Sequence, residues 1–234
     1  PLPYLARIPG FPLEACRHCY TDASIWDAFD PALITLCSPD PQAYRPPDLG
    51  PNTLQVGLPT NFKAARFESE DHTAILRQLE ADISTARYDT EHGPIEVPVK
   101  LKVHDSVFVP LAKWCMLLAG NYRCIQKENM RSIKEAVHNN LEESRRIYQL
   151  VMDLCMTLGA KEEDLVPFEK YAHAAKSLKN PSSAARALFS GAPNIERVDL
   201  LVQTIAAKQN RHDFAIDEIV EFVNHRLEIN RHDD

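Results

Sequence analysis

Prolines are concentrated in the first quarter of the chain, and this constrains the fold more than any other feature of the sequence. Eleven of the 17 prolines lie within residues 1–59. Proline removes a backbone donor and blocks the preceding helical turn, so long helices are excluded there. Short runs between and after the prolines have the composition of strands; they are residues 32–37 (ALITLC), 53–58 (TLQVGL) and 62–68 (FKAARFE).

One helix is predicted to follow these strands. Ser69 is a suitable N-cap, and apolar residues recur at helical spacing between Ile75 and Ile83. The predicted helix covers residues 70–83. Together with the short strands, it predicts a partial α/β layer over residues 1–95, with too few strands to close a sheet alone.

From Lys100 onward, the apolar periodicity is helical almost everywhere. Pro110 lies inside the first predicted helix and is expected to kink it near Ser106. The predicted fold class is therefore α+β, with the small α/β layer followed by an all-helical domain over residues 96–234. The predicted helices are residues 100–120, 127–158 and 163–178, a short helix after Asn180, another after Asn194, and residues 216–228.

Capping residues predict where these helices begin and end. Gly159 is expected to stop the long second helix, and Gly191 the short one. Asn180 is a good N-cap because Pro181 follows it at the first helical position. Asn194 is the predicted N-cap of the next helix.

Composition excludes several classes of protein. The net charge is −7, and the lysines and arginines are scattered, which argues against a nucleic-acid-binding protein. No run of 18 apolar residues predicts a membrane span, and residues 1–11 lack the pattern of a signal peptide. With six cysteines in a chain long enough to bury a core, reduced thiols and a cytoplasmic location are expected.

The motif ACRHCY places Cys16 and Cys19 at C-x-x-C spacing with His18 between them. A structural zinc site would need a second pair of ligands at similar spacing. The chain offers only isolated candidates such as Cys37 and His72. A reduced pair is favoured over a metal site, and a small zinc-stabilised module is a third alternative for the whole chain.

The stretch NPSSAARALFSGAPNIERVD suggests an anion site, because the first turn of a helix exposes unpaired N–H groups. Ser183 could bind a carboxylate there, beside Ser182. Glu196 is predicted in the first turn of the next helix, where the helix dipole favours its charge. Both features are also explained by ordinary capping, which is the commoner situation.

Two lysines are the candidates for acid chemistry. Lys100 and Lys102 open the first predicted helix, and either could act as a general acid or electrostatic stabiliser beside a carbonyl. His104 and Asp105 follow one turn later, within reach of the same pocket. Either lysine could equally be a surface residue.

The order of these segments resembles the C-terminal half of the ketopantoate reductase (2-dehydropantoate 2-reductase) family. The resemblance covers roughly residues 97–228: KLKVHDSVFVPL, a long helix ending in LGA, NPSSAARALFSGAPNIERVD and a pair of helices. Residues 30–90 resemble the end of the nucleotide-binding half. The family implies a helical substrate-binding and dimerisation domain similar to the C-terminal domain of 6-phosphogluconate dehydrogenase, a homodimer, and NADP-dependent reduction of a 2-keto acid.

The resemblance implies a role for each candidate residue. Lys100 would protonate the developing alkoxide, with Lys102 as the competing choice. Ser183 would bind the substrate carboxylate, and Glu196 would accept a hydrogen bond from a substrate hydroxyl. His104 and Asp105 fall where the family has an asparagine that binds substrate. The second asparagine of the family falls at Phe108 or Val109, depending on whether Lys100 or Lys102 is aligned with the family's lysine.

The dinucleotide-binding half is not apparent in this sequence. No G-x-G-x-x-G motif, P-loop or G-x-S-x-G motif is present, and the seven glycines are not clustered. Under the resemblance, either a glycine-rich Rossmann half lies upstream of Pro1, or this version has lost cofactor binding; the proline-rich start and the unpartnered strands favour the first. The alternative from a different class is a non-catalytic helical dimerisation or binding module.

Overall fold

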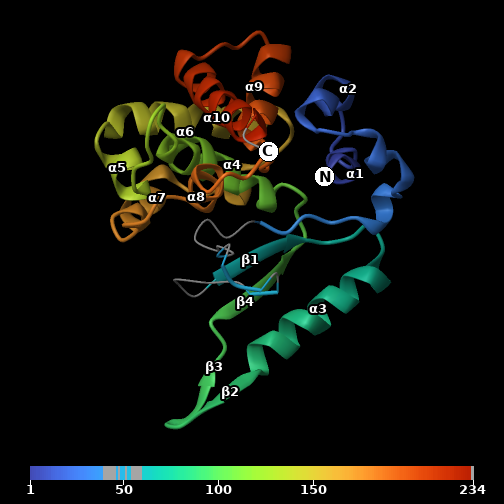
Figure 1. Ribbon diagram of the computed structural model, residues 1–234. Coiled ribbons are helices and arrows are strands. Elements are labelled where there is room, and N and C mark those ends of the chain that lie inside the picture. Colours follow the sequence, from blue (N-terminus) through green and yellow to red (C-terminus); the bar gives the residue numbers. More distant parts are fainter. Residues whose placement is uncertain (39–45, 47, 51, 54–59, 233–234) are drawn as a thin grey trace.

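The structure is a computed structural model that describes residues 1–38, 46, 48–50, 52–53 and 60–232. It is of mixed α+β class. Helices form the upper part of the view in Figure 1, and a small sheet with one long helix lies below them. No helix in the described part of the chain is both long and apolar enough to cross a membrane.

The small sheet is parallel. Strand β1 (Thr60–Ala65) pairs with strand β4 (Val99–His104), so that Lys63 lies beside Lys102. A parallel pair needs a crossover connection, and here it consists of helix α3 (Glu70–Thr85) and a hairpin. Strands β2 (Arg87–Thr90) and β3 (Gly93–Glu96) form this hairpin, which projects away from the rest of the chain (Figure 1).

Both edges of this sheet are covered by other groups of the chain. Residues 36–38 run antiparallel along β1, and the N–H of Ser38 donates to the carbonyl of Lys63 at 2.9 Å. On β4, the N–H of Val103 donates to the carboxylate of Glu80 from α3 at 2.9 Å. A further strand could pair here only by displacing these groups.

The strand and helix predictions for residues 1–95 are partly confirmed. Strand β1 overlaps the third predicted run but begins two residues earlier, and α3 begins after Ser69, whose side chain accepts from the N–H of His72 as an N-cap. Residues 31–33 form a 3₁₀ turn instead of a strand, because the side chain of Asp30 accepts from the N–H of Ala32 as an N-cap and Pro31 follows it. Of the run at 53–58, all but Thr53 lies outside the described residues.

The prediction of one kinked helix over residues 100–120 is wrong. Residues 99–104 alternate β-branched or leucine side chains with lysines and form β4, which suits a strand. Pro110 lies in the first turn of the helical segment, where it needs no hydrogen-bond partner, so it starts the segment instead of kinking it. The segment comprises a 3₁₀ turn (Val109–Leu111), α4 (Ala112–Met116), a π turn (Leu117–Asn121) and a second 3₁₀ turn (Tyr122–Cys124).

The predicted helix at 127–158 is divided into two. Helix α5 (Ile133–His138) begins with a capping box between Ser132 and Glu135, and α6 (Leu141–Thr157) begins at the N-cap Asn140. Gly159 follows α6 with a φ of 112°, which confirms it as the stop. The third predicted helix is shorter than expected, since α7 (Phe168–Ala175) begins only after Pro167.

The last three helices are α8 (Ser183–Phe189), α9 (Val198–Lys208) and α10 (Phe214–His232). Two predicted caps are wrong. Ser182, not Asn180, is the N-cap of α8, and α9 begins four residues after Asn194 with Arg197 at its N-cap. Gly191 has a φ of 88° and ends α8 as predicted.

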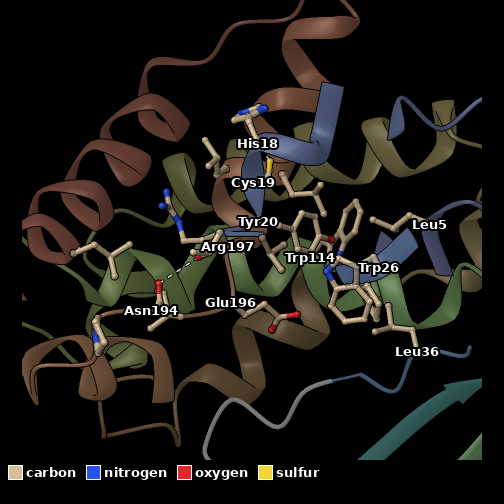
Figure 2. Close-up of a pocket in the computed structure, with 18 of the residues that line it drawn as sticks. Leu5, His18, Cys19, Tyr20, Trp26, Leu36, Trp114, Asn194, Glu196 and Arg197 are labelled. Atoms are coloured by element: carbon tan, nitrogen blue, oxygen red, sulfur yellow. Dashed lines mark hydrogen bonds between the residues drawn. The ribbon is translucent and has the colours of Figure 1, made fainter. Parts of the chain in front are cut away.

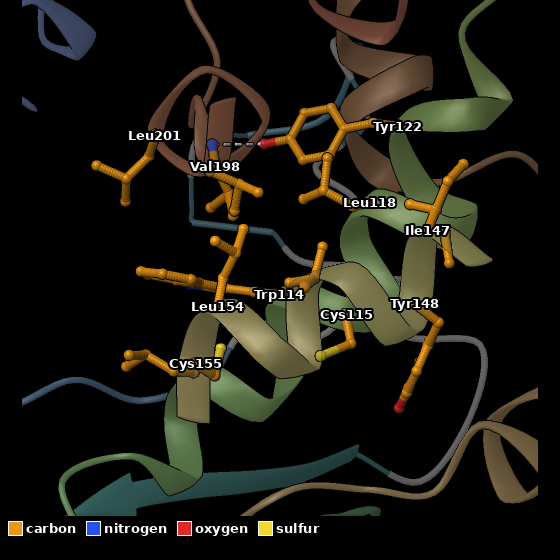
Figure 3. Close-up of a cluster of buried hydrophobic side chains, with 14 of the residues drawn as sticks. Trp114, Cys115, Leu118, Tyr122, Ile147, Tyr148, Leu154, Cys155, Val198 and Leu201 are labelled. Atoms are coloured by element: carbon orange, nitrogen blue, oxygen red, sulfur yellow. Dashed lines mark hydrogen bonds between the residues drawn. The ribbon is translucent and has the colours of Figure 1, made fainter. Parts of the chain in front are cut away.

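The hydrophobic core joins the helices to the start of the chain. Tyr148 and Ile147 of α6 are fully buried against α4, and Figure 3 shows this cluster reaching Val198 of α9. Residues of α1 (Leu2–Leu5) belong to the same cluster, as does Cys16 at the end of α2 (Leu13–Cys16). The first residues of the chain therefore pack with the helices.

Candidate functional site

A cavity lies between residues 1–36, helix α4 and the start of α9, and is called the main cavity below (Figure 2). Its volume is about 880 Å³, within the range of sites for small organic ligands. One end is apolar, with walls formed by Trp26 and Trp114. The other end is polar and includes Asn194, Arg197 and Arg231.

Glu196 lies between these two ends, on the segment that leads into α9. Tyr122 holds this segment in place: its hydroxyl donates to the carbonyl of Glu196 at 2.5 Å and accepts from the N–H of Val198 at 3.1 Å. Glu196 is exposed to solvent at the cavity, yet the surrounding protein partly desolvates its carboxyl group and so raises the pKa of that group. The site thus presents a carboxylate on a backbone segment that a buried tyrosine holds in place.

The polar end is organised by two arginines. Arg197 forms a paired hydrogen bond with Asp199, whose side chain is fully buried, at 3.0 Å and 2.9 Å. Burial raises the pKa of Asp199, and Arg197 acts against this shift. Arg231 of α10 donates to the side-chain oxygen of Asn194 at 3.1 Å. The second arginine is exposed and has donors left for a ligand.

Ser183 does not line this cavity, and its neighbour Ser182 is the residue that fixes the start of α8. The hydroxyl of Ser182 donates to the carbonyl of Asn121 at 2.7 Å and accepts from the N–H of Ala185 at 3.2 Å. Ser182 therefore fixes the start of α8 to the end of the α4 segment. Ser183 is the first residue of a helix of seven residues and is only half-buried.

The two candidate lysines lie on the sheet. The ammonium of Lys100 is 3.8 Å from the carboxylate of Glu96, and that of Lys102 is 3.5 Å from Glu80. Lys100 borders a separate cavity of about 450 Å³ between α3 and the strands, which shares no residue with the cavity at Glu196. Neither lysine lines the larger cavity.

The remaining two candidates are also on β4 or just after it. Asp105 pairs with Arg77 of α3 at 2.7 Å. His104 ends the strand, and its Nε2 is buried without a hydrogen-bond partner in the described structure. Burial lowers the pKa of His104, and the nearby Lys63 and Lys102 lower it further.

The structure therefore brings only one predicted site residue, Glu196, into the main cavity. The aromatic walls and Arg231 were not singled out from the sequence. They come from segments that are far apart in the sequence, around Trp26, Trp114 and Arg231, so no local motif indicates them. The signal available was the cluster of aromatic residues at Tyr20, Trp26 and Phe29 in a region without long helices.

No group of three or more histidine, cysteine or acidic side chains suited to a metal ion occurs in the described parts of the chain. Cys16 and Cys19 are free thiols, and Cys16 is completely buried.

The turn between β1 and α3 does not fit a dinucleotide. The strand–helix turn between β1 and α3 is where a Rossmann unit would bind pyrophosphate. Here it is formed by residues 66–69 without a glycine, and Glu70 and Asp71 occupy the first helical turn. These carboxylates would repel a phosphate group, so no step is assigned to a nicotinamide cofactor within this chain.

Comparison with known proteins identifies no relative of this chain. The sequence matches no family model, and neither the curated proteins nor the solved structures include a match to it.

Proposed function

We propose that the chain binds a small 2-keto or 2-hydroxy acid in the cavity at Glu196. The observation that carries this proposal is the arrangement of that cavity, in which one carboxylate lies between an apolar aromatic end and an end with two arginines. Arg231 would pair with the ligand carboxylate. Glu196 would accept a hydrogen bond from a ligand hydroxyl, and Trp26 and Trp114 would cover its apolar part.

In the fuller form of the proposal, the chain is the substrate-binding part of an NAD(P)H-dependent reductase similar to ketopantoate reductase. The helical region would correspond to the family's helical domain, which resembles the C-terminal domain of 6-phosphogluconate dehydrogenase. A Rossmann domain outside this chain would bind NADP. Lys100 or Lys102 would be the acid, and Ser183, His104 and Asp105 would bind the substrate. These roles require that the Rossmann domain or a closing motion bring the residues to the ligand.

Ligand binding is the first test. The purified chain is titrated with small 2-keto and 2-hydroxy acids while its thermal unfolding is followed, because a ligand that binds only the folded state raises the Tm. Glu196→Gln should weaken the affinity by about tenfold, as expected for loss of a charged hydrogen bond. Glu128→Gln changes an exposed glutamate in another loop and is the matched control. Equal affinities in all three proteins would refute the site.

Turnover is the second test. Oxidation of NADPH by these acids is measured with the chain joined to a Rossmann domain of the reductase type, with Lys100→Ala, Lys102→Ala and Ser183→Ala as variants. The reductase proposal expects activity that one lysine variant loses. Full activity in all three variants would remove their assignments.

A second candidate function is a non-catalytic helical binding or dimerisation module. It is favoured by the absence of any lysine from the main cavity and by Phe214 at the start of α10, which is 82% exposed. Ligand binding without turnover would support this function over the reductase. A dimer that dissociates on Phe214→Ser, measured by light scattering, would support homodimerisation through this helix.

A further inference from the structure

A thiol and an imidazole on the wall of the main cavity meet a hydroxyl group of helix α9. The sulfur of Cys19 is 3.9 Å from Nε2 of His18 and 3.6 Å from the hydroxyl of Thr204 on α9. The same hydroxyl is 3.3 Å from Nε2 of His18. Figure 2 shows His18 and Cys19 together on the side of the cavity away from Glu196.

The backbone fixes which nitrogen of His18 faces the thiol. Nδ1 of His18 is 2.8 Å from the carbonyl of Ala15, which can only accept, so Nδ1 carries the proton. In the neutral ring, Nε2 is then unprotonated and faces Cys19. This is the arrangement in which an imidazole can take the proton of a thiol.

A second thiol lies one 3₁₀ turn earlier. Cys16 immediately precedes the 3₁₀ turn Arg17–Cys19, and side chains three residues apart eclipse one another in such a turn. With a rise of about 2 Å per residue, their Cα atoms lie about 6 Å apart, within the range of about 4.4–6.8 Å for disulfides. Cys16 is completely buried and Cys19 half-buried, so only Cys19 meets a reagent that enters the cavity.

We propose that Cys19 and Cys16 are a redox-active dithiol that is oxidised by a small-molecule disulfide entering the cavity. Cys19 is the attacking thiol, His18 is its base, and Cys16 is the resolving thiol. The proposal does not depend on the keto-acid function, since none of these three residues is used there.

The exchange is balanced without any other oxidant. His18 takes the proton of Cys19, whose sulfur attacks one sulfur of the small disulfide and breaks its S–S bond. The first leaving thiolate takes the proton from His18. Cys16 then attacks the sulfur of Cys19, and the second thiolate leaves with the proton of Cys16. One disulfide has been reduced to two thiols, and the two cysteines have been oxidised to a disulfide.

The cavity suits a peptide-like disulfide such as oxidised glutathione. Its volume of about 880 Å³ is within the range of sites for small organic ligands, and Arg231 provides a partner for the carboxylates of such a disulfide. Burial raises the pKa of Cys19, while the hydrogen bond to Thr204 and the charge of Arg197 oppose that shift. The reaction should therefore be slow at neutral pH and accelerate as the pH rises.

The test is incubation of the folded full chain with oxidised glutathione, followed by mass spectrometry of its peptides. The wild type should form a Cys16–Cys19 disulfide. Cys16→Ser and Cys16→Ala should both accumulate glutathione on Cys19, while Cys19→Ser should leave Cys16 reduced. Cys37 is exposed and has no paired thiol, so Cys37→Ser is the control and should not change the disulfide.

The role of His18 is tested by rate. His18→Asn should slow the first step by roughly 100-fold, the lower end of what a positioned base contributes, while His92→Asn on the exposed hairpin should not. A Cys16 variant that carries no glutathione on Cys19 while Cys37 reacts would overturn the proposal. An unchanged rate in His18→Asn would remove His18 as the base.

Discussion

Helices α3 and α6 are almost equal in length, with 16 and 17 residues, but they contribute differently to the fold. Helix α6 buries seven residues against its neighbours, whereas α3 buries only Thr73. Ile75 and Leu79 on the apolar face of α3 are 69% and 47% exposed. An amphipathic pattern therefore predicts a helix but does not show whether the apolar face of that helix is covered.

The difference follows from what surrounds each helix. Helix α6 packs against α4, α5 and α7, so its apolar stripe meets other stripes on several sides. Helix α3 packs on the two-stranded sheet, mainly along β4. A sheet of two strands offers too little apolar area to cover such a helix. The free energy of folding should therefore be concentrated in the helical region.

The same substitution in both helices is the strongest test of this comparison. Ile147→Ala in α6 removes a fully buried side chain and should lower the free energy of unfolding by roughly 3–4 kcal/mol. Ile75→Ala in α3 should change it by less than about 0.5 kcal/mol. Both are measured by urea denaturation. A loss at Ile75 close to that at Ile147 would show that the face of α3 is covered in solution.

Close packing at the π turn allows a second test within the helical region. A Cβ on Gly120 would lie 2.0 Å from the hydroxyl oxygen of Tyr171 and 3.0 Å from Cγ2 of Val137. Gly120→Ala should therefore cost about 2–3 kcal/mol through overpacking, despite the higher helix propensity of alanine. The measurement is the urea midpoint.

The contact with Tyr171 can be separated from other effects of this substitution. Tyr171→Phe removes the hydroxyl group that the new methyl would meet, although it also removes the hydrogen bond to the carbonyl of Met116. Gly120→Ala should cost less in the Tyr171→Phe background than in the wild type. Equal costs in both backgrounds would mean that the clash lies elsewhere.

Adjacent serines give a smaller contrast. Ser182→Ala removes the N-cap of α8 and a buried hydrogen bond to Asn121, so it should cost about 1–2 kcal/mol. Ser183→Ala removes a half-buried hydroxyl without a hydrogen bond in the described structure and should cost under about 0.5 kcal/mol. Thermal unfolding measures both. If Ser183→Ala cost more than Ser182→Ala, Asn180 or Ser183 would be the N-cap instead of Ser182.

Much of the helical region could be predicted from the sequence, because its signals are local. The stops at Gly159 and Gly191 and the N-cap at Ser69 depend on single residues and were correct. The split at Asn139 and Asn140 was missed because the apolar spacing continues across it. Residues 100–104 were predicted as helix because the apolar spacing fits both a strand and a helix in so short a run.

The candidate site was predicted less well, for a physical reason. Lys100 and Lys102 were grouped with the later residues on the assumption that β4 was part of the helix, and as strand residues they face different partners. Glu196 was singled out for a helix dipole that it does not face, since α9 begins only at Val198. Its place in the cavity depends on Tyr122 and on residues 1–36, which tertiary packing alone brings together.

The smallest expected effect concerns the basic face of the sheet and its response to pH. The pKa of His104 is lowered from 6.5 by burial and by Lys63 and Lys102, so the unfolded chain binds a proton there more readily than the folded chain. The stability linked to this residue is therefore present above pH 6.5 and is lost as the pH falls toward the lowered pKa.

The measurement is the free energy of unfolding of the wild type and of His104→Gln at several pH values from 8 down to 5. As the pH falls below 6.5, the free energy of unfolding of His104→Gln should rise relative to that of the wild type, because glutamine does not take up a proton. His92→Gln on the exposed hairpin is the control and should follow the wild type. Parallel curves for wild type and His104→Gln would mean that the buried Nε2 finds a hydrogen-bond partner in solution. The sheet would then be less exposed to solvent than the exposed apolar face of α3 indicates.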